Sequence, residues 1–153
     1  MWIPPEDTDP VLLHAPTRRS VSLFGAVNLR RGQMVTRFEK KFDAMTFSAF
    51  LHQLRRHHRP GHPMRVILDN ARYHHAQLLA PFLEQCRQEF QLLFLPPYSP
   101  DLNPIERVWK LARRLSTHNR YFAELEELVS AVTQEMQQWH KPNKTLTRLC
   151  GII

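Results

Sequence analysis

The feature that most constrains the fold is a proline-rich segment in the second half of the chain, LLFLPPYSPDLNPIERVW, residues 92–109. Its first two prolines cannot donate to a β-ladder, so they end the apolar run before them as a strand. Pro104 suits the first turn of a helix, where its missing N–H costs nothing, and Asn103 before it is a favourable N-cap. The pattern predicts a strand, a stiff loop and a helix with Glu106 in its first turn. Such a backbone fixes the Glu106 carboxylate in place, as a metal ligand requires.

An upstream segment offers a second carboxylate at the end of another strand. The apolar run MRVILDN, residues 64–70, is typical of a buried strand and closes on Asp69. In open α/β sheets, ligands gather outside the carboxyl ends of the strands. We therefore expect Asp69 and Glu106 to converge on one divalent cation.

Each of these carboxylates has a more ordinary interpretation when it is taken alone. Asp69 and Asn70 both favour turns, so they can simply mark the end of a strand. Glu106 and Lys110 lie four residues apart on one helix face, where a surface ion pair contributes about 0.3–0.5 kcal/mol. The two segments together with the proline loop favour the metal site over both alternatives.

Hydrophobic periodicity predicts the other elements. Their expected order is a β-hairpin over 20–28 and 33–38, a helix capped by Thr46, the strand 65–69, a helix over 75–88, a strand over 91–95 parallel to the one before it, the helix after the loop, and a helix of about five turns with an apolar seam over 122–139. Gly25 permits a close approach or a bulge. Pro81 either kinks its helix or starts a new turn. The apolar face of the helix after the loop is expected to hold Ile105, Val108, Ala112 and Leu115.

Composition limits the classes of function. The chain has 153 residues, a formal net charge of +7 and a pI near 10.0, which permits binding to nucleic acid or to an anionic surface without proving either. No apolar run of about 18 residues exists, so no membrane span or membrane partner is expected. The N-terminus lacks signal-peptide features, which indicates a cytoplasmic protein. Cys86 and Cys150 form no metal-spaced pair and are expected to be reduced and structural.

The segments LDNARYHH and FLPPYSPDLNPIERVWK together resemble the catalytic core of the DDE transposases of the mariner-like insertion-sequence superfamily. The resemblance is specific in the motifs Asp-Asn-x-x-x-His and Pro-Pro-Tyr-Ser-Pro-x-Leu-Asn-Pro-Ile-Glu. It is looser at Trp2, at LFGAVN over 23–28 and in the helices after Leu115. It implies an α/β ribonuclease H-like fold, a mixed sheet flanked by helices, in a single catalytic domain over residues 1–153.

The resemblance also implies the chemistry of the site. Strand cleavage and transfer in DNA would use two Mg²⁺ or Mn²⁺ ions, with Asp69 and Glu106 as catalytic residues and metal ligands. Asn70 and His74 belong to the motif and shape the site, with His74 expected at its mouth. Asn103 is expected to cap the helix rather than to bind metal.

The expected partner is double-stranded DNA, at transposon ends and target, which would associate the protein with the nucleoid. A homodimer stays open as a second expectation. Side chains expected to contact phosphates are Arg72, Lys110, Arg113 and Arg114. Tyr98 either packs against the loop or stacks on a base, and packing is the favoured interpretation.

In the family that the chain resembles, a first strand carries the first catalytic aspartate and precedes the segment that matches Trp2. Glu6, Asp7 and Asp9 follow Trp2 in a proline-rich stretch, so we do not expect them to take that role. We expect an incomplete N-terminus, a missing first strand and little cleavage by this chain alone. Two alternatives to a transposase fragment stay open: an inactive basic nucleic-acid-binding domain, or a downstream half that complements a separate N-terminal chain. Residues 10–15 or that partner would cover the strand edge left unpaired.

Overall fold

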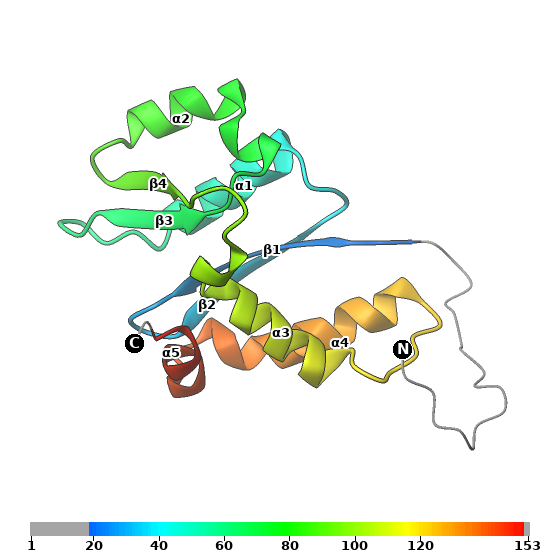
Figure 1. Cartoon of the computed structure of the whole chain (residues 1–153). Helices are drawn as coiled ribbons and strands as arrows, with labels where there is room; N and C mark the ends of the chain where they lie inside the picture. The colour runs from blue at the N-terminus through cyan, green and yellow to red at the C-terminus, as the bar shows by residue number, and fades with distance from the viewer. Residues whose placement is uncertain (1–18, 152–153) are drawn as a thin grey trace, which may run out of the picture.

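The computed structural model describes residues 19–151. Trp2, the three acidic residues after it and the segment 10–15 lie outside this range, so the expectations placed on them stay untested. The described residues form three layers (Figure 1). A β-hairpin lies in the middle, a second pair of strands with the helices of residues 44–85 lies on one side, and the helices that follow the proline loop lie on the other.

The hairpin joins β1 (Ser22–Asn28) and β2 (Gln33–Glu39), as predicted. The strands are antiparallel, in a register that pairs Ser22 with Glu39 and Asn28 with Gln33. The turn between them is closed by the side chain of Asn28, which accepts from the N–H groups of Arg30 and Arg31 at 3.0 and 3.1 Å. Gly32 has φ of +59°, a conformation that glycine adopts without strain.

The first helix, α1, spans Ala44–Arg55. Its N-cap is Asp43, so the prediction that Thr46 is the cap was wrong by three residues. Thr46 is instead the N3 partner in a capping box, where Asp43 Oδ1 accepts from Thr46 N at 2.9 Å and Thr46 Oγ1 accepts from Asp43 N at 3.0 Å. The buried face holds the four residues that the periodicity selects: Phe47, Phe50, Leu51 and Leu54.

The second pair of strands, β3 (Met64–Leu68) and β4 (Phe90–Phe94), is parallel, as predicted. The connection between them is not one helix over 75–88. It consists of the short helices η1 (Arg72–His75) and η2 (Gln77–Leu79) and the helix α2 (Ala80–Gln85), in which Pro81 occupies the first turn. Pro81 therefore starts a new helix, where its missing N–H is harmless.

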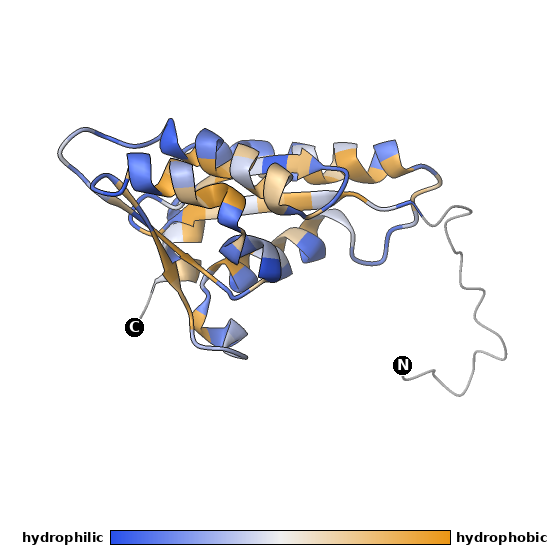
Figure 2. Ribbon diagram, turned by 90° about the horizontal axis from the view of Figure 1, so that it is seen from above, coloured by the Kyte–Doolittle hydropathy of each residue, from blue (hydrophilic) through white to orange (hydrophobic). Residues whose placement is uncertain are grey.

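Only one face of the β3–β4 pair is buried. Leu68 and Phe90 are 7% and 1% exposed, whereas the paired residues Ile67 and Leu93 are 41% and 43% exposed. The prediction of a buried strand over 64–70 was therefore wrong for the face that Ile67 occupies. Figure 2 shows long hydrophobic stretches along the strands, whereas the helices alternate between hydrophobic and hydrophilic residues.

After the loop come η3 (Pro100–Leu102), α3 (Ile105–Ser116), α4 (Leu125–Gln137), η4 (Gln138–His140) and α5 (Lys144–Cys150). Two predictions for this half were wrong. Leu115 is 44% exposed, and Ser116 takes its place in the core with its hydroxyl donating to Ala112 O at 2.6 Å. The last long helix begins at Leu125 rather than at 122, and α5 was not predicted.

The hairpin separates two hydrophobic clusters. Phe24 of β1 lies in the first cluster with Leu68 of β3 and the apolar face of α1, and Met34 of β2 lies in the second with α3, α4 and α5. A Cβ added at Gly25 would lie 2.6 Å from Cζ2 of Trp109, so Gly25 is the close approach between the hairpin and α3. The fold thereby fixes α3 against the sheet.

Within the described residues, β1 and β3 each have a hydrogen-bonded neighbour along one edge only. They contribute to the same hydrophobic cluster without pairing with each other. Cys86 and Cys150 are buried and unpaired, and burial raises the pKa of both thiols, as expected of structural cysteines. Across residues 19–151, the helices are too short or too polar to cross a membrane.

Candidate metal and nucleic-acid site

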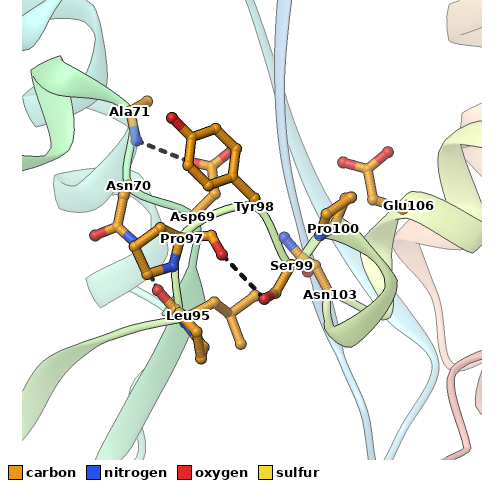
Figure 3. A pocket seen from close by; sticks show the side chains of 11 residues that line it. Asp69, Asn70, Ala71, Leu95, Pro97, Tyr98, Ser99, Pro100, Asn103 and Glu106 are labelled. Carbon is orange, nitrogen blue, oxygen red and sulfur yellow. Dashed lines mark hydrogen bonds between the residues drawn. The ribbon is translucent and has the colours of Figure 1, made fainter.

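Asp69 and Glu106 line the same pocket, a hollow of about 410 Å³ at the carboxyl ends of β3 and β4. Asp69 follows β3 directly, and Glu106 lies in the first turn of α3. The proline loop, residues 95–100, lines the same pocket. In Figure 3 the two carboxylates lie on different sides of this loop. The structure thus brings the two predicted carboxylates to one site.

His74 lies behind Asp69 and holds it. Its Nδ1 lies 2.9 Å from the carbonyl oxygen of Asp69 and 3.0 Å from Oδ1 of the same residue. Because a carbonyl oxygen only accepts, Nδ1 must carry a proton and donate. His74 is 9% exposed and its ring centroid lies 4.4 Å from that of Phe47. The prediction that His74 lies at the mouth of the site was therefore wrong.

Burial lowers the pKa of His74 below its usual 6.5, while the hydrogen bond to the Asp69 carbonyl and the Asp69 charge act in the opposite direction. The imidazole is therefore neutral at pH 7 and holds Asp69 as a hydrogen-bond donor. The Asp69 carboxylate is 67% exposed, and its Oδ1 also accepts from Ala71 N at 3.2 Å. This geometry leaves the carboxylate directed toward the pocket and open to a ligand.

Asn70 fastens the end of β3 to the start of the proline loop. Its Nδ2 donates to the carbonyl oxygen of Leu95, and its Oδ1 accepts from Nε2 of His75 at 3.1 Å. The backbone adds a parallel contact, because Leu95 N donates to Leu68 O at 2.9 Å. Asn70 is thus a brace for one wall of the pocket.

We predict that Asn70→Ala lowers the free energy of unfolding by about 1 kcal/mol, because both side-chain hydrogen bonds are lost from an exposed position. Amide hydrogen exchange at Leu95 should accelerate in the same variant. Asn70→Asp is the matched comparison: it keeps an acceptor for His75 but places an oxygen against the Leu95 carbonyl. Equal protection of the Leu95 amide in all three proteins would contradict the bracing role.

Asn103 positions Glu106. Its carbonyl oxygen accepts from Glu106 N at 3.1 Å, and its Oδ1 lies 3.4 Å from Ile105 N. The N-cap of α3 is Pro104, without a capping side chain, so the prediction that Asn103 caps this helix was wrong by one residue. Within residues 19–151, the Glu106 carboxylate has no hydrogen-bond or ion-pair partner, so the ordinary pair with Lys110 is not formed. The carboxylate is half-buried. It is therefore held by its backbone and free to bind a ligand.

The last helix, α5, supports the start of α3, a role that the sequence pattern does not predict. Arg107 donates from Nη1 to the carbonyl oxygens of Leu149 and Gly151 at 3.1 and 3.4 Å. Cys150 is buried with Sγ 3.8 Å from the carbonyl oxygen of Pro104. The signal that could have predicted α5 is Asn143 after a proline: its Oδ1 accepts from the N–H groups of the next turn at 2.9 and 3.2 Å.

The predicted phosphate-binding side chains lie outside the pocket wall. Lys110, Arg113 and Arg114 are exposed on α3, and Arg72 is exposed on η1. In the part of the chain that the structure describes, none of the four forms an ion pair. Lys110 and Arg113 follow Glu106 at i+4 and i+7, so they extend along the same helix face. This face therefore has positive charge available beside Glu106.

The donor atoms fit a hard divalent cation. Mg²⁺ takes oxygen ligands, usually one or two protein carboxylates beside several waters and substrate phosphates. Asp69 and Glu106 supply two carboxylates around an open pocket, which leaves positions for water and phosphate. Among residues 19–151, no three histidine, cysteine or acidic side chains gather closely enough to hold a metal by themselves. The site thus matches magnesium or manganese better than zinc, which prefers a closed set of nitrogen and sulfur ligands.

Comparisons of sequence place this chain among known proteins. The profile of the family described as "DDE superfamily endonuclease" matches residues 1–129. An uncharacterized protein, y4pE/y4sA of Sinorhizobium fredii (strain NBRC 101917 / NGR234), is 32% identical over 108 residues, which cover 71% of this chain and 76% of that protein.

Comparisons of structure indicate the fold. The chain in the crystal structure of the Mos1 strand transfer complex matches with a TM-score of 0.68 and 18% identity, over 98% of this chain and 44% of that one. A chain of the simian T-cell lymphotropic virus intasome, in complex with a PP2A regulatory subunit, matches with a TM-score of 0.53 and 19% identity, over 73% and 41%. This chain thus spans less than half of each solved chain. The likeness shows a mixed α/β, ribonuclease H-like fold, as predicted.

Proposed function

Since this chain belongs to the DDE superfamily endonucleases, we propose that residues 1–153 form the catalytic domain of a DNA transposase that cuts and joins strands with divalent metal ions. The observation that carries this proposal is the pocket shared by Asp69 and Glu106. The Mos1 structure is a strand transfer complex and the viral one is an intasome, and they support DNA as the substrate. Transposon ends and target DNA are then the partners.

Each residue of the site has a part in this chemistry. A divalent cation, when bound, stabilises charge on the attacking and leaving oxygens of an in-line displacement. Asp69 and Glu106 would hold it, His74 keeps Asp69 in place, and Asn70 fixes the proline loop that lines the pocket. Lys110 and Arg113 would bind phosphates on the Glu106 side. A further carboxylate would come from outside the described residues or from a second chain.

The test is metal binding by calorimetry with Mg²⁺ and Mn²⁺. Asp69→Asn and Glu106→Gln should each weaken binding by about tenfold or more, because an amide is a poorer ligand for a hard cation and carries no charge. Glu84→Gln is the matched control, since this exposed carboxylate on α2 pairs with Arg87 at 3.6 Å, away from the pocket. Equal affinity in the parent protein and both site variants would overturn the metal site.

The unpaired edges of β1 and β3 favour a second candidate, in which a separate chain adds a strand between the two sheets. Unpaired backbone groups next to a core are costly, and Phe24 of β1 and Leu68 of β3 belong to one hydrophobic cluster. The isolated chain should then aggregate, or dissolve only with its partner. A monomer with one cooperative melt would contradict this candidate.

An inactive nucleic-acid-binding domain would instead bind DNA, with a salt-dependent affinity, and show no metal dependence.

A further inference from the structure

Tyr98 lies at a position where its side chain does not contribute to the stability of the fold. Its side chain is fully exposed, with a relative exposure of 103%. Its backbone has φ of +56°, in the left-handed region, where the Cβ of a non-glycine residue is crowded. The prediction that Tyr98 packs against the loop was therefore wrong. Neither burial nor backbone preference explains a tyrosine here, which leaves the surface function of the ring.

The loop presents this ring in a fixed place. Prolines stand at 96, 97 and 100, and the hydroxyl of Ser99 donates to the carbonyl oxygen of Pro97 at 3.2 Å. Leu102 N donates to Ser99 O at 3.2 Å, which closes the turn that follows. The loop is tied to β3 through Asn70 and Leu95. Tyr98 is thus an aromatic side chain on a braced loop rather than on a free one.

The position of Tyr98 indicates its ligand. The residue lines the same pocket as Asp69 and Glu106, and in the view of Figure 3 its ring overlaps the Asp69 side chain. A phosphate that a divalent cation holds at the carboxylates would carry its sugar and base past the rim of the pocket. Exposed aromatic rings beside such a site stack on unpaired bases, and they do so with little preference for sequence.

We propose that Tyr98 stacks on an unpaired nucleobase next to the phosphate held at the pocket, and so sets which strand end is bound there. This inference rests on the proposed function, because it requires DNA at the carboxylates. It assigns Tyr98 to positioning the strand and not to the chemical step. A rival role for the same residue is nucleophilic attack, which would require the hydroxyl group. Stacking requires only the aromatic ring.

The experiment measures binding by fluorescence anisotropy with labelled duplexes in Mg²⁺. One duplex carries a short single-stranded overhang of thymidines, and its control carries an abasic overhang of the same length. Tyr98→Asn should weaken binding of the thymidine overhang by about 5- to 150-fold, the range for loss of one stacked base. Binding of the abasic overhang should stay unchanged. Asparagine removes the ring and tolerates positive φ, so the loop keeps its conformation.

Tyr98→Phe keeps the ring and should bind as the parent protein does. A loss in Tyr98→Phe equal to that in Tyr98→Asn would overturn stacking in favour of the hydroxyl. Equal binding of both overhangs by the parent protein, or unchanged binding in Tyr98→Asn, would overturn stacking and leave the proposed function standing. Failure of the parent protein to bind any duplex at low salt would overturn both. Thermal melts of the three proteins show that each variant is folded.

Discussion

Replacing Leu146 with alanine is expected to lower the free energy of unfolding by about 3–5 kcal/mol, the largest change in stability that we predict. Leu146 is 0% exposed and lies in the cluster with Met34, Val108 and Trp139. Alanine at this position leaves a cavity among residues of β2, α3, α5 and η4, and packed neighbours relax only partly into such a space. Chemical denaturation with urea measures the loss directly.

Leu115→Ala is the control, because it makes the same chemical change at a leucine that is 44% exposed on α3. It should cost less than about 1 kcal/mol, since little apolar area leaves water there. If the two variants lose equal stability, α5 does not form part of the core. Leu146→Ala should also weaken metal binding at Glu106, because Arg107 and Cys150 connect α5 to the start of α3.

The sequence was sufficient for the elements whose pattern is local. The β-hairpin and the buried face of α1 agree with the predictions because strand composition and helical spacing are local features. The parallel pairing of β3 and β4 agrees because the chain crosses back between the two strands. The helix predicted over 75–88 was wrong because Pro81 starts a new helix there. Helix α5 has seven residues, too few for its periodicity to stand out, and its stability comes from tertiary packing.

The candidate site was predictable where backbone geometry decides it. A strand end and a proline-bounded helix start are local features, and they bring Asp69 and Glu106 to one pocket. The position of His74 was not predictable, because whether a polar ring after a strand points inward depends on the aromatic residues of α1 against which it packs. The exposure of Tyr98 depends on a left-handed backbone at a non-glycine residue, which sequence patterns disfavour.

Neutralising two cations on α3 is expected to change the salt dependence of DNA binding. In Lys110→Gln combined with Arg113→Gln, the slope of log K against log salt should become shallower by about 1.8, or about 0.9 for each phosphate that the protein no longer neutralises. At 0.1 M salt the removal of both cations corresponds to about a 60-fold decrease in affinity. Titrations of a labelled duplex at several salt concentrations measure both quantities.

We expect Lys110 and Arg113 to bind phosphates because of their spacing along α3. Lys110 and Arg113 lie about 6 and 10.5 Å from Glu106 along the axis of α3, at 1.5 Å per residue. Phosphates of one DNA strand recur about every 3.4 Å along the duplex axis, so the two cations lie about two and three phosphates from the carboxylate. A DNA strand that runs along α3, with one phosphate near Glu106, would therefore meet both cations. Their removal should weaken binding of every sequence alike, since interactions with phosphates carry no base information.

Arg56→Gln combined with Arg59→Gln is the matched control. Both arginines are exposed, and they lie before β3, at the end of that strand opposite Asp69. This variant loses the same net charge as the α3 variant. If long-range attraction by the positive net charge accounts for binding, the two variants should change the slope equally. A change confined to the α3 variant would place the DNA backbone along the helix that carries Glu106, whereas an unchanged slope in the α3 variant would remove α3 from the DNA-binding surface.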